Sequence, residues 1–67
     1  MSNRQPFQQR VADEKSELDD RLKKLKLFQV TEVFDGLPDA EKARLRCQQL
    51  VMQCYSELLY DRINAFE

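Results

Sequence analysis

The chain has 67 residues, which is enough for one small domain, and its 11 basic and 12 acidic residues give a formal net charge of −1. A non-specific nucleic-acid binder of this size is usually strongly basic, so the charge balance speaks against that class. The first ten residues contain no apolar run, and no later apolar run approaches the length of a membrane span. We therefore expect a soluble protein of the cytoplasm.

A chain this short buries only about 60% of the surface that its unfolded form exposes, so it needs a disulfide, a metal or a partner chain. Its two cysteines, Cys47 and Cys54, are seven residues apart. On a helix this separates them by roughly 10 Å, which is beyond the ~7 Å limit for a bridge. They either pack as small apolar residues or meet their copies across a two-fold axis. With no histidine, the sequence predicts no metal site and no cofactor.

The first predicted helix covers residues 6–29. Pro6 suits a first helical turn, because proline lacks the N–H that this turn leaves unpaired. Six apolar residues then recur at spacings of four, seven, four, three and three, which is a helical period. They are Phe7, Val11, Leu18, Leu22, Leu25 and Phe28.

A short helical connector is predicted over residues 30–37. Thr31 is a suitable N-cap for one helical turn, and Gly36, the only glycine, is expected to end that turn with a positive φ. The Leu37-Pro38 step marks a new helix start, since the residue before proline avoids helical geometry. We expect Val33, Phe34 and Leu37 to cover the open end of the hairpin.

The second predicted helix covers residues 38–65. One apolar stripe should face the first helix, and it consists of Leu45, Met52, Tyr55, Leu59, Ile63 and Phe66. A second set, Leu50, Val51, Cys54 and Leu58, widens the stripe beyond what one opposing helix can cover. Such a patch usually marks an interface. The predicted fold is therefore an all-α, single-domain, two-helix antiparallel hairpin with a short helical connector, which assembles into a helical bundle as a homo-oligomer. A dimer forming a four-helix bundle is the simplest case, and a higher oligomer is the alternative.

Nothing in the sequence has the pattern of an active site. The commonest general base is absent because there is no histidine, and one glycine cannot make a phosphate loop. Ser16 and Ser56 have no base at catalytic spacing. We therefore expect a protein that is not an enzyme.

Polar residues interrupt the apolar seam of the second helix at Gln48 and Arg62, with Tyr55 midway between them. In one interpretation they fix the register of the hairpin by pairing with the first helix, for example Arg62 with Glu14. In the other they line a pocket at a subunit junction, where an aromatic ring stacks on a base and basic side chains meet phosphate. The candidate ligand-binding residues are Tyr55, Arg62, Arg10, Lys15 and Gln48.

Three segments resemble a family of very small, mostly uncharacterised proteins of tailed phages, some of them catalogued by their relation to a crAss-like phage. The segments are QRVADEKSELDDRLKKLKLF in the first helix, FDGLPDAEKARL across the connector and MQCYSELLYDRI in the second helix. The resemblance covers nearly the whole chain. No catalytic or binding residues are assigned in that family, so it transfers none to this sequence.

The resemblance implies a phage protein that acts in the cytoplasm of an infected bacterium, and short phage proteins of this kind often block a host defence. One hypothesis is an oligomeric sponge that sequesters cyclic di- or trinucleotide immune signals between subunits. A second is a steric inhibitor that binds a host defence complex, as anti-CRISPR proteins do, through a charged helix face. A third is a structural or regulatory coiled-coil adaptor.

Overall fold

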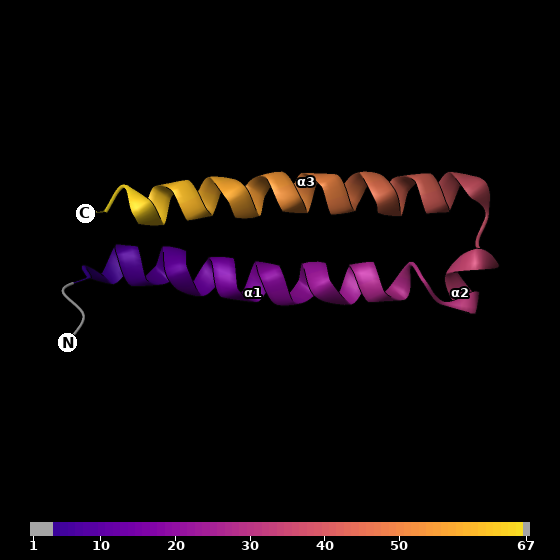
Figure 1. The fold of residues 1–67 in the computed structure, drawn as a ribbon, viewed down its shortest axis with the longest axis horizontal. Coiled ribbons are helices and arrows are strands. Elements are labelled where there is room, and N and C mark those ends of the chain that lie inside the picture. Colours follow the sequence, from indigo (N-terminus) through magenta and orange to yellow (C-terminus); the bar gives the residue numbers. More distant parts are fainter. Residues whose placement is uncertain (1–3, 67) are drawn as a thin grey trace.

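The computed structural model of the chain describes residues 4–66. It contains α1 (Pro6–Phe28), the single turn α2 (Glu32–Asp35) and α3 (Asp39–Asn64), and this part of the chain has no strand. Figure 1 shows α1 and α3 side by side and antiparallel, with α2 at the turn. The predicted all-helical chain with two long packed helices is confirmed.

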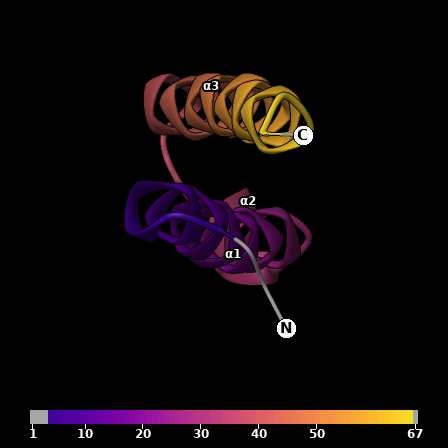
Figure 2. The same ribbon diagram turned by 90° about the vertical axis from the view of Figure 1, so that its left-hand side faces the viewer.

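The molecule is elongated, and the end-on view in Figure 2 shows α3 lying against α1. Its extents are 48 × 18 × 13 Å and its radius of gyration is 15.3 Å, whereas a compact domain of this length has about 11 Å. Its accessible surface of 5262 Å² exceeds the roughly 4,500 Å² of an ordinary monomer of this mass. A single hairpin therefore encloses little interior.

The core lies along the line where α1 and α3 touch. Val11 and Leu18 of α1 pack around Leu59 of α3, which is fully buried. Toward the chain ends, the Phe7 and Phe66 rings meet edge to face with centroids 5.9 Å apart. The buried residues repeat at helical spacing, so the apolar pattern of the sequence dictates which faces meet.

The start of α2 follows the sequence prediction and its end does not. The Thr31 Oγ1 accepts a hydrogen bond from the Phe34 N–H at 3.2 Å, which confirms the N-cap. Gly36 has a φ of −80°, so the expected positive φ is wrong. Its N–H continues the helical pattern by donating to the Glu32 carbonyl at 3.1 Å. The chain changes direction two residues later, at the extended Pro38.

Phe34 closes the turn end of the hairpin. It is only 3% exposed, and its ring meets the Phe28 ring edge to face. The Arg46 guanidinium lies over the Phe34 ring, 5.4 Å from its centre. Leu37 is half-buried, but Val33 is 67% exposed. The predicted role of Val33 is thus wrong, because a single helical turn presents only one face to the hairpin and Phe34 occupies it.

Candidate functional site

Polar contacts flank the core on two opposite edges of the helix pair. Neighbouring residues point to different edges, because each step along a helix turns the side chain by about 100°. Lys15, Asp19 and Ser56 form one edge, called here the Ser56 edge. Glu14, Tyr55, Arg10 and Arg62 lie on the other, called the Tyr55 edge.

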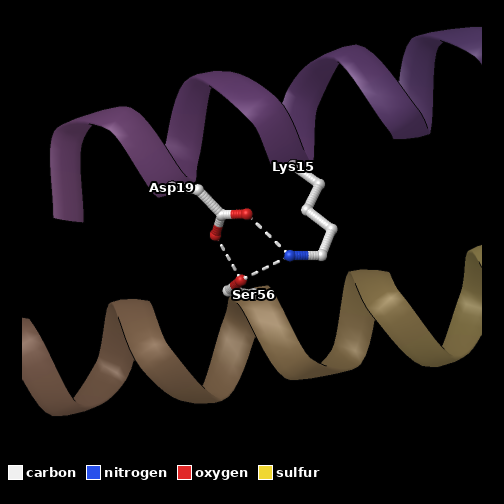
Figure 3. Close-up of polar contacts among 3 residues, drawn as sticks. All are labelled: Lys15, Asp19 and Ser56. Atoms are coloured by element: carbon white, nitrogen blue, oxygen red, sulfur yellow. Dashed lines mark hydrogen bonds and ion pairs between the residues drawn. The ribbon is translucent and has the colours of Figure 1, made fainter. Parts of the chain in front are cut away.

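On the Ser56 edge three side chains form a closed cluster between α1 and α3, shown in Figure 3. The Lys15 Nζ lies 2.6 Å from the Asp19 Oδ2 and 3.1 Å from the Ser56 Oγ. The Ser56 hydroxyl, 8% exposed, donates to the Asp19 Oδ1 at 2.5 Å. The hydrogen bond from Lys15, and next that from Ser56, lower the pKa of the Asp19 carboxyl. The cluster thus holds the two helices in register.

The polar groups of the cluster bind one another. The Ser56 hydroxyl donates to a carboxylate whose other oxygen binds the Lys15 ammonium. Lys15, a predicted ligand residue, is therefore occupied in a helix contact. Sequence reasoning missed Asp19 and Ser56, although Ser56 lies three residues before the buried Leu59, on the same helix face.

On the Tyr55 edge the Tyr55 hydroxyl donates to the Glu14 carboxylate across the helix pair. This hydrogen bond is the main cause of a raised pKa of the Tyr55 phenol, and the positive charge of Arg62 acts in the opposite sense. The expected pairing of Arg62 with Glu14 is wrong, since Tyr55 takes that carboxylate and Arg62 is exposed. Tyr55 is 38% exposed, so its ring remains accessible.

Arg10 and Arg62 lie at nearly the same level along the hairpin. Two cross-helix contacts bracket them, Glu14 with Tyr55 on one side and Phe7 with Phe66 on the other. Arg10 lies four residues before Glu14, and Arg62 lies seven after Tyr55, so both lie on this edge. Both are exposed, and neither forms an ion pair with another residue of the described chain.

Gln48 lies seven residues before Tyr55 and thus on the same face of α3, where it is exposed. Its amide contacts the Met52 sulfur at 3.9 Å. Of the five candidate ligand residues, the hairpin thus brings Tyr55, Arg62 and Arg10 together. Gln48 lies about 10 Å farther along the helix, and Lys15 lies on the opposite edge.

Next to the Tyr55 edge, an apolar stripe of α3 faces away from α1. Its large residues are mostly exposed, at 65% for Leu50, 63% for Val51 and 53% for Leu58. Cys47 and Cys54 lie in the same stripe as free, exposed thiols. We call these five residues the α3 stripe. Residues 4–66 of one hairpin leave it uncovered.

Residues 4–66 contain no group of three or more histidine, cysteine, aspartate or glutamate side chains that could hold a metal ion. No helix in this part of the chain is long and apolar enough to cross a membrane.

No curated protein and no solved structure matches the chain. A family model described as Sequestin matches residues 5–65, which include all three helices and both edges of the hairpin. The chain belongs to the Sequestin family.

Proposed function

We propose that this protein is a non-enzymatic sponge of phage origin, which acts in the cytoplasm of an infected bacterium by binding a cyclic oligonucleotide immune signal without destroying it. The observation that carries the proposal is the Tyr55 edge, where two arginines without carboxylate partners flank an accessible aromatic ring. The family name, Sequestin, denotes sequestration and supports this choice.

The chemistry of the edge suits a compact molecule with several phosphates and bases. Guanidinium groups bind phosphate through paired N–H donors, and the Arg10 and Arg62 guanidiniums are free to do so. A base stacks well on an aromatic face, and both Tyr55 and the half-exposed Phe7 offer one. Glu14 opposes anion binding, but its carboxylate is engaged by the Tyr55 hydroxyl.

Self-association is part of the proposal. The α3 stripe exposes three large aliphatic side chains, while residues 4–66 bury only five hydrophobic residues. A core this small contributes little stability by itself. A partner surface packed on the α3 stripe would supply the buried apolar area that the monomer lacks. Sedimentation at micromolar concentration should give at least a dimer. A well-folded monomer would contradict this part of the proposal.

A thermal-shift screen tests ligand binding. A ligand bound only by the folded state stabilises it by about 2.7 kcal/mol at a hundred times its Kd. We expect at least one member of a panel of cyclic di- and trinucleotides to raise Tm, and Arg62→Ala and Arg10→Ala to abolish the shift without changing the sedimentation of the protein. Lys23→Ala, an exposed basic residue of α1 elsewhere, is the matched control. No shift across the panel would contradict the sponge function.

A second candidate is a steric inhibitor of a host defence protein. The exposed face of α1 favours it, because Ser16, Glu17, Asp20 and Lys23 line a shallow depression there with mixed charges. An inhibitor should co-purify with a host protein from infected cells, and its binding should weaken with salt. Capture that depends on Asp20 and Lys23, with no cyclic nucleotide bound, would favour it over the sponge. A coiled-coil adaptor would show self-association or a phage-encoded partner alone.

A further inference from the structure

α3 carries a second heptad seam, separate from the one that packs on α1. Cys47, Val51, Cys54 and Leu58 follow one another at spacings of four, three and four, which is the spacing of a coiled-coil seam. Arg44 and Asp61 extend the same series by three residues at each end. Around the helix this seam lies between a quarter-turn and a half-turn from the buried Leu59. α3 is therefore shaped to contact two helices, of which the hairpin supplies one.

We propose that the second helix is α3 of another copy of this chain, packed antiparallel, with Val51 facing Cys54 of the partner subunit. The inference rests on the self-association proposed above and specifies its geometry. Two-fold symmetry makes such an interface use the same surface twice. Once one facing pair is set, every other pair along the seam follows.

In this register the facing side chains of the two seams complement each other in size. Cys47 lies opposite Leu58 of the partner subunit, and Val51 lies opposite Cys54 of the partner subunit. Each small thiol thus faces a larger aliphatic side chain, which is how interdigitating layers fill space without voids. The interface contains Val51 and Leu58, the two large aliphatic residues of the seam, which one hairpin leaves 63% and 53% exposed.

Charged residues of the two seams also face each other with opposite sign. Arg44 lies opposite Asp61 of the partner subunit. This pair occurs twice by symmetry. Within one chain Arg44 already binds Glu41 at 2.9 Å, so at each end of the interface Arg44 lies between two carboxylates.

A parallel pairing in register would place like charges and side chains of equal size opposite each other. It would place Arg44 against Arg44 of the partner subunit and Asp61 against Asp61 of the partner subunit. Like charges facing each other across a seam are destabilising. It would also stack cysteine on cysteine and leucine on leucine, which alternates loose and crowded layers. The charge pattern of α3 therefore selects the antiparallel arrangement.

The pairing creates a groove that one hairpin lacks. On α3 the Tyr55 edge lies between the face that packs on α1 and the seam, so in the dimer it lies in the angle between α1 and the partner's α3. Gln48 of the partner subunit is then opposite Tyr55. The groove crosses the two-fold axis and carries Tyr55, Arg62 and Gln48 from both copies, which suits a ligand that is itself two-fold symmetric.

Disulfide trapping under mild oxidation tests the direction without any ligand. In the variant Cys54→Ser/Leu58→Cys, the introduced thiol lies opposite Cys47 of the partner subunit, so a covalent dimer should form. The matched control is Cys54→Ser alone, in which the two Cys47 thiols of an antiparallel dimer are about 16 Å apart along the axis and should stay reduced. A covalent dimer of the control would show parallel pairing and overturn the proposal.

A charge swap gives a second readout that needs no new cysteine. Arg44→Asp and Asp61→Arg should each raise the dimer Kd about tenfold, since each places like charges opposite one another twice. The double swap Arg44→Asp/Asp61→Arg should restore the Kd to near that of the wild type. Within one chain the two positions are about 25 Å apart, so rescue requires contact between copies. Failure of the double swap to rescue would contradict the proposed register.

The outcomes separate this inference from the proposed function. A monomer in sedimentation would contradict both the proposed oligomer and the antiparallel seam. A dimer with the parallel trapping pattern would contradict the seam geometry but not the proposed sequestration. An antiparallel dimer that gives no thermal shift with the cyclic nucleotide panel would confirm the seam and contradict the sponge function.

Discussion

The Ser56 hydroxyl of α3 donates a hydrogen bond to the Asp19 carboxylate of α1 from a position that is 8% exposed. This contact joins the two helices near the middle of the hairpin, where the Lys15 ammonium binds both partners. Because a buried serine with satisfied hydrogen bonds fixes register as well as contributing energy, this cluster holds α1 and α3 in one register.

Ser56→Ala should lower the free energy of unfolding by about 1 kcal/mol, the usual net value of such a hydrogen bond. Urea titration followed by circular dichroism measures the change, at one fixed protein concentration because association shifts the midpoint. Ser16→Ala, which alters an exposed serine on α1, is the control and should change little. Equal effects of the two substitutions would show that the cross-helix contact contributes nothing.

The Asp19 carboxyl should make the protein sensitive to acid. Its pKa in the folded state is lowered from the ordinary 3.8, first by the Lys15 hydrogen bond and then by that of Ser56. A lowered folded-state pKa contributes stability above the unfolded-state pKa, and the contribution is lost as the pH falls through the folded-state pKa. Between pH 6 and about pH 3, the wild type should therefore lose more stability than Asp19→Asn. Urea midpoints at both pH values measure the difference, and identical losses would contradict it.

How far the sequence predicts the fold depends on the kind of signal. The helices follow from apolar residues at helical spacing, as with Val11, Leu18 and Leu22, because only one face of each helix can be buried. The Thr31 cap is predictable because its hydroxyl is placed to accept the Phe34 N–H. The conformation of Gly36 is not, since glycine adopts both signs of φ and the sequence does not state which one the turn requires.

The candidate site is less predictable, for a physical reason. Spacing places a residue on a helix face, but which edge it lies on depends on the register between two helices. Tyr55 and Ser56 are neighbours in the sequence, yet Tyr55 binds Glu14 and Ser56 binds Asp19 on opposite edges. The sequence pairs Arg62 with Glu14 by charge alone, whereas the register gives that carboxylate to Tyr55. Lys15 is a candidate ligand residue by its charge, and the register places it on the Ser56 edge.

Gly36→Ala should stabilise the protein by about 0.4–1 kcal/mol. The φ of −80° is open to alanine, and an added Cβ meets only the Val33 and Glu32 carbonyl oxygens, at 3.6 and 3.7 Å. Alanine then reduces the entropy of the unfolded chain without strain. Thermal unfolding measures the change. Gly36→Pro is the contrasting variant and should destabilise the turn, because it removes the N–H that donates to Glu32. A lower Tm for Gly36→Ala would mean that the turn does require a positive φ.

The Tyr55 phenol should ionise at higher pH in the wild type than in Glu14→Gln. The hydrogen bond to the Glu14 carboxylate raises the Tyr55 pKa, and a neutral amide lacks the charge that opposes formation of a phenolate. An ultraviolet titration in a Tyr60→Phe background isolates Tyr55, since the chain has only two tyrosines. Superimposable titration curves for the two proteins would show that the Glu14 contact is absent in solution.

Leu58 and Leu59 are neighbours on α3 and should respond differently to the same change. Leu59 is fully buried against α1, whereas Leu58 is 53% exposed on the α3 stripe. Leu59→Ala removes core packing and should cost about 2–5 kcal/mol of unfolding free energy, so the hairpin should lose stability at every protein concentration. Leu58→Ala removes only a surface that a second copy would cover, so it should weaken the rise of Tm with protein concentration and leave the dilute protein nearly unchanged. Circular dichroism melts over a hundredfold dilution series, with the two variants side by side, separate the effects. If the two variants shift Tm equally at every dilution, Leu58 belongs to the hairpin core and the α3 stripe is not an interface.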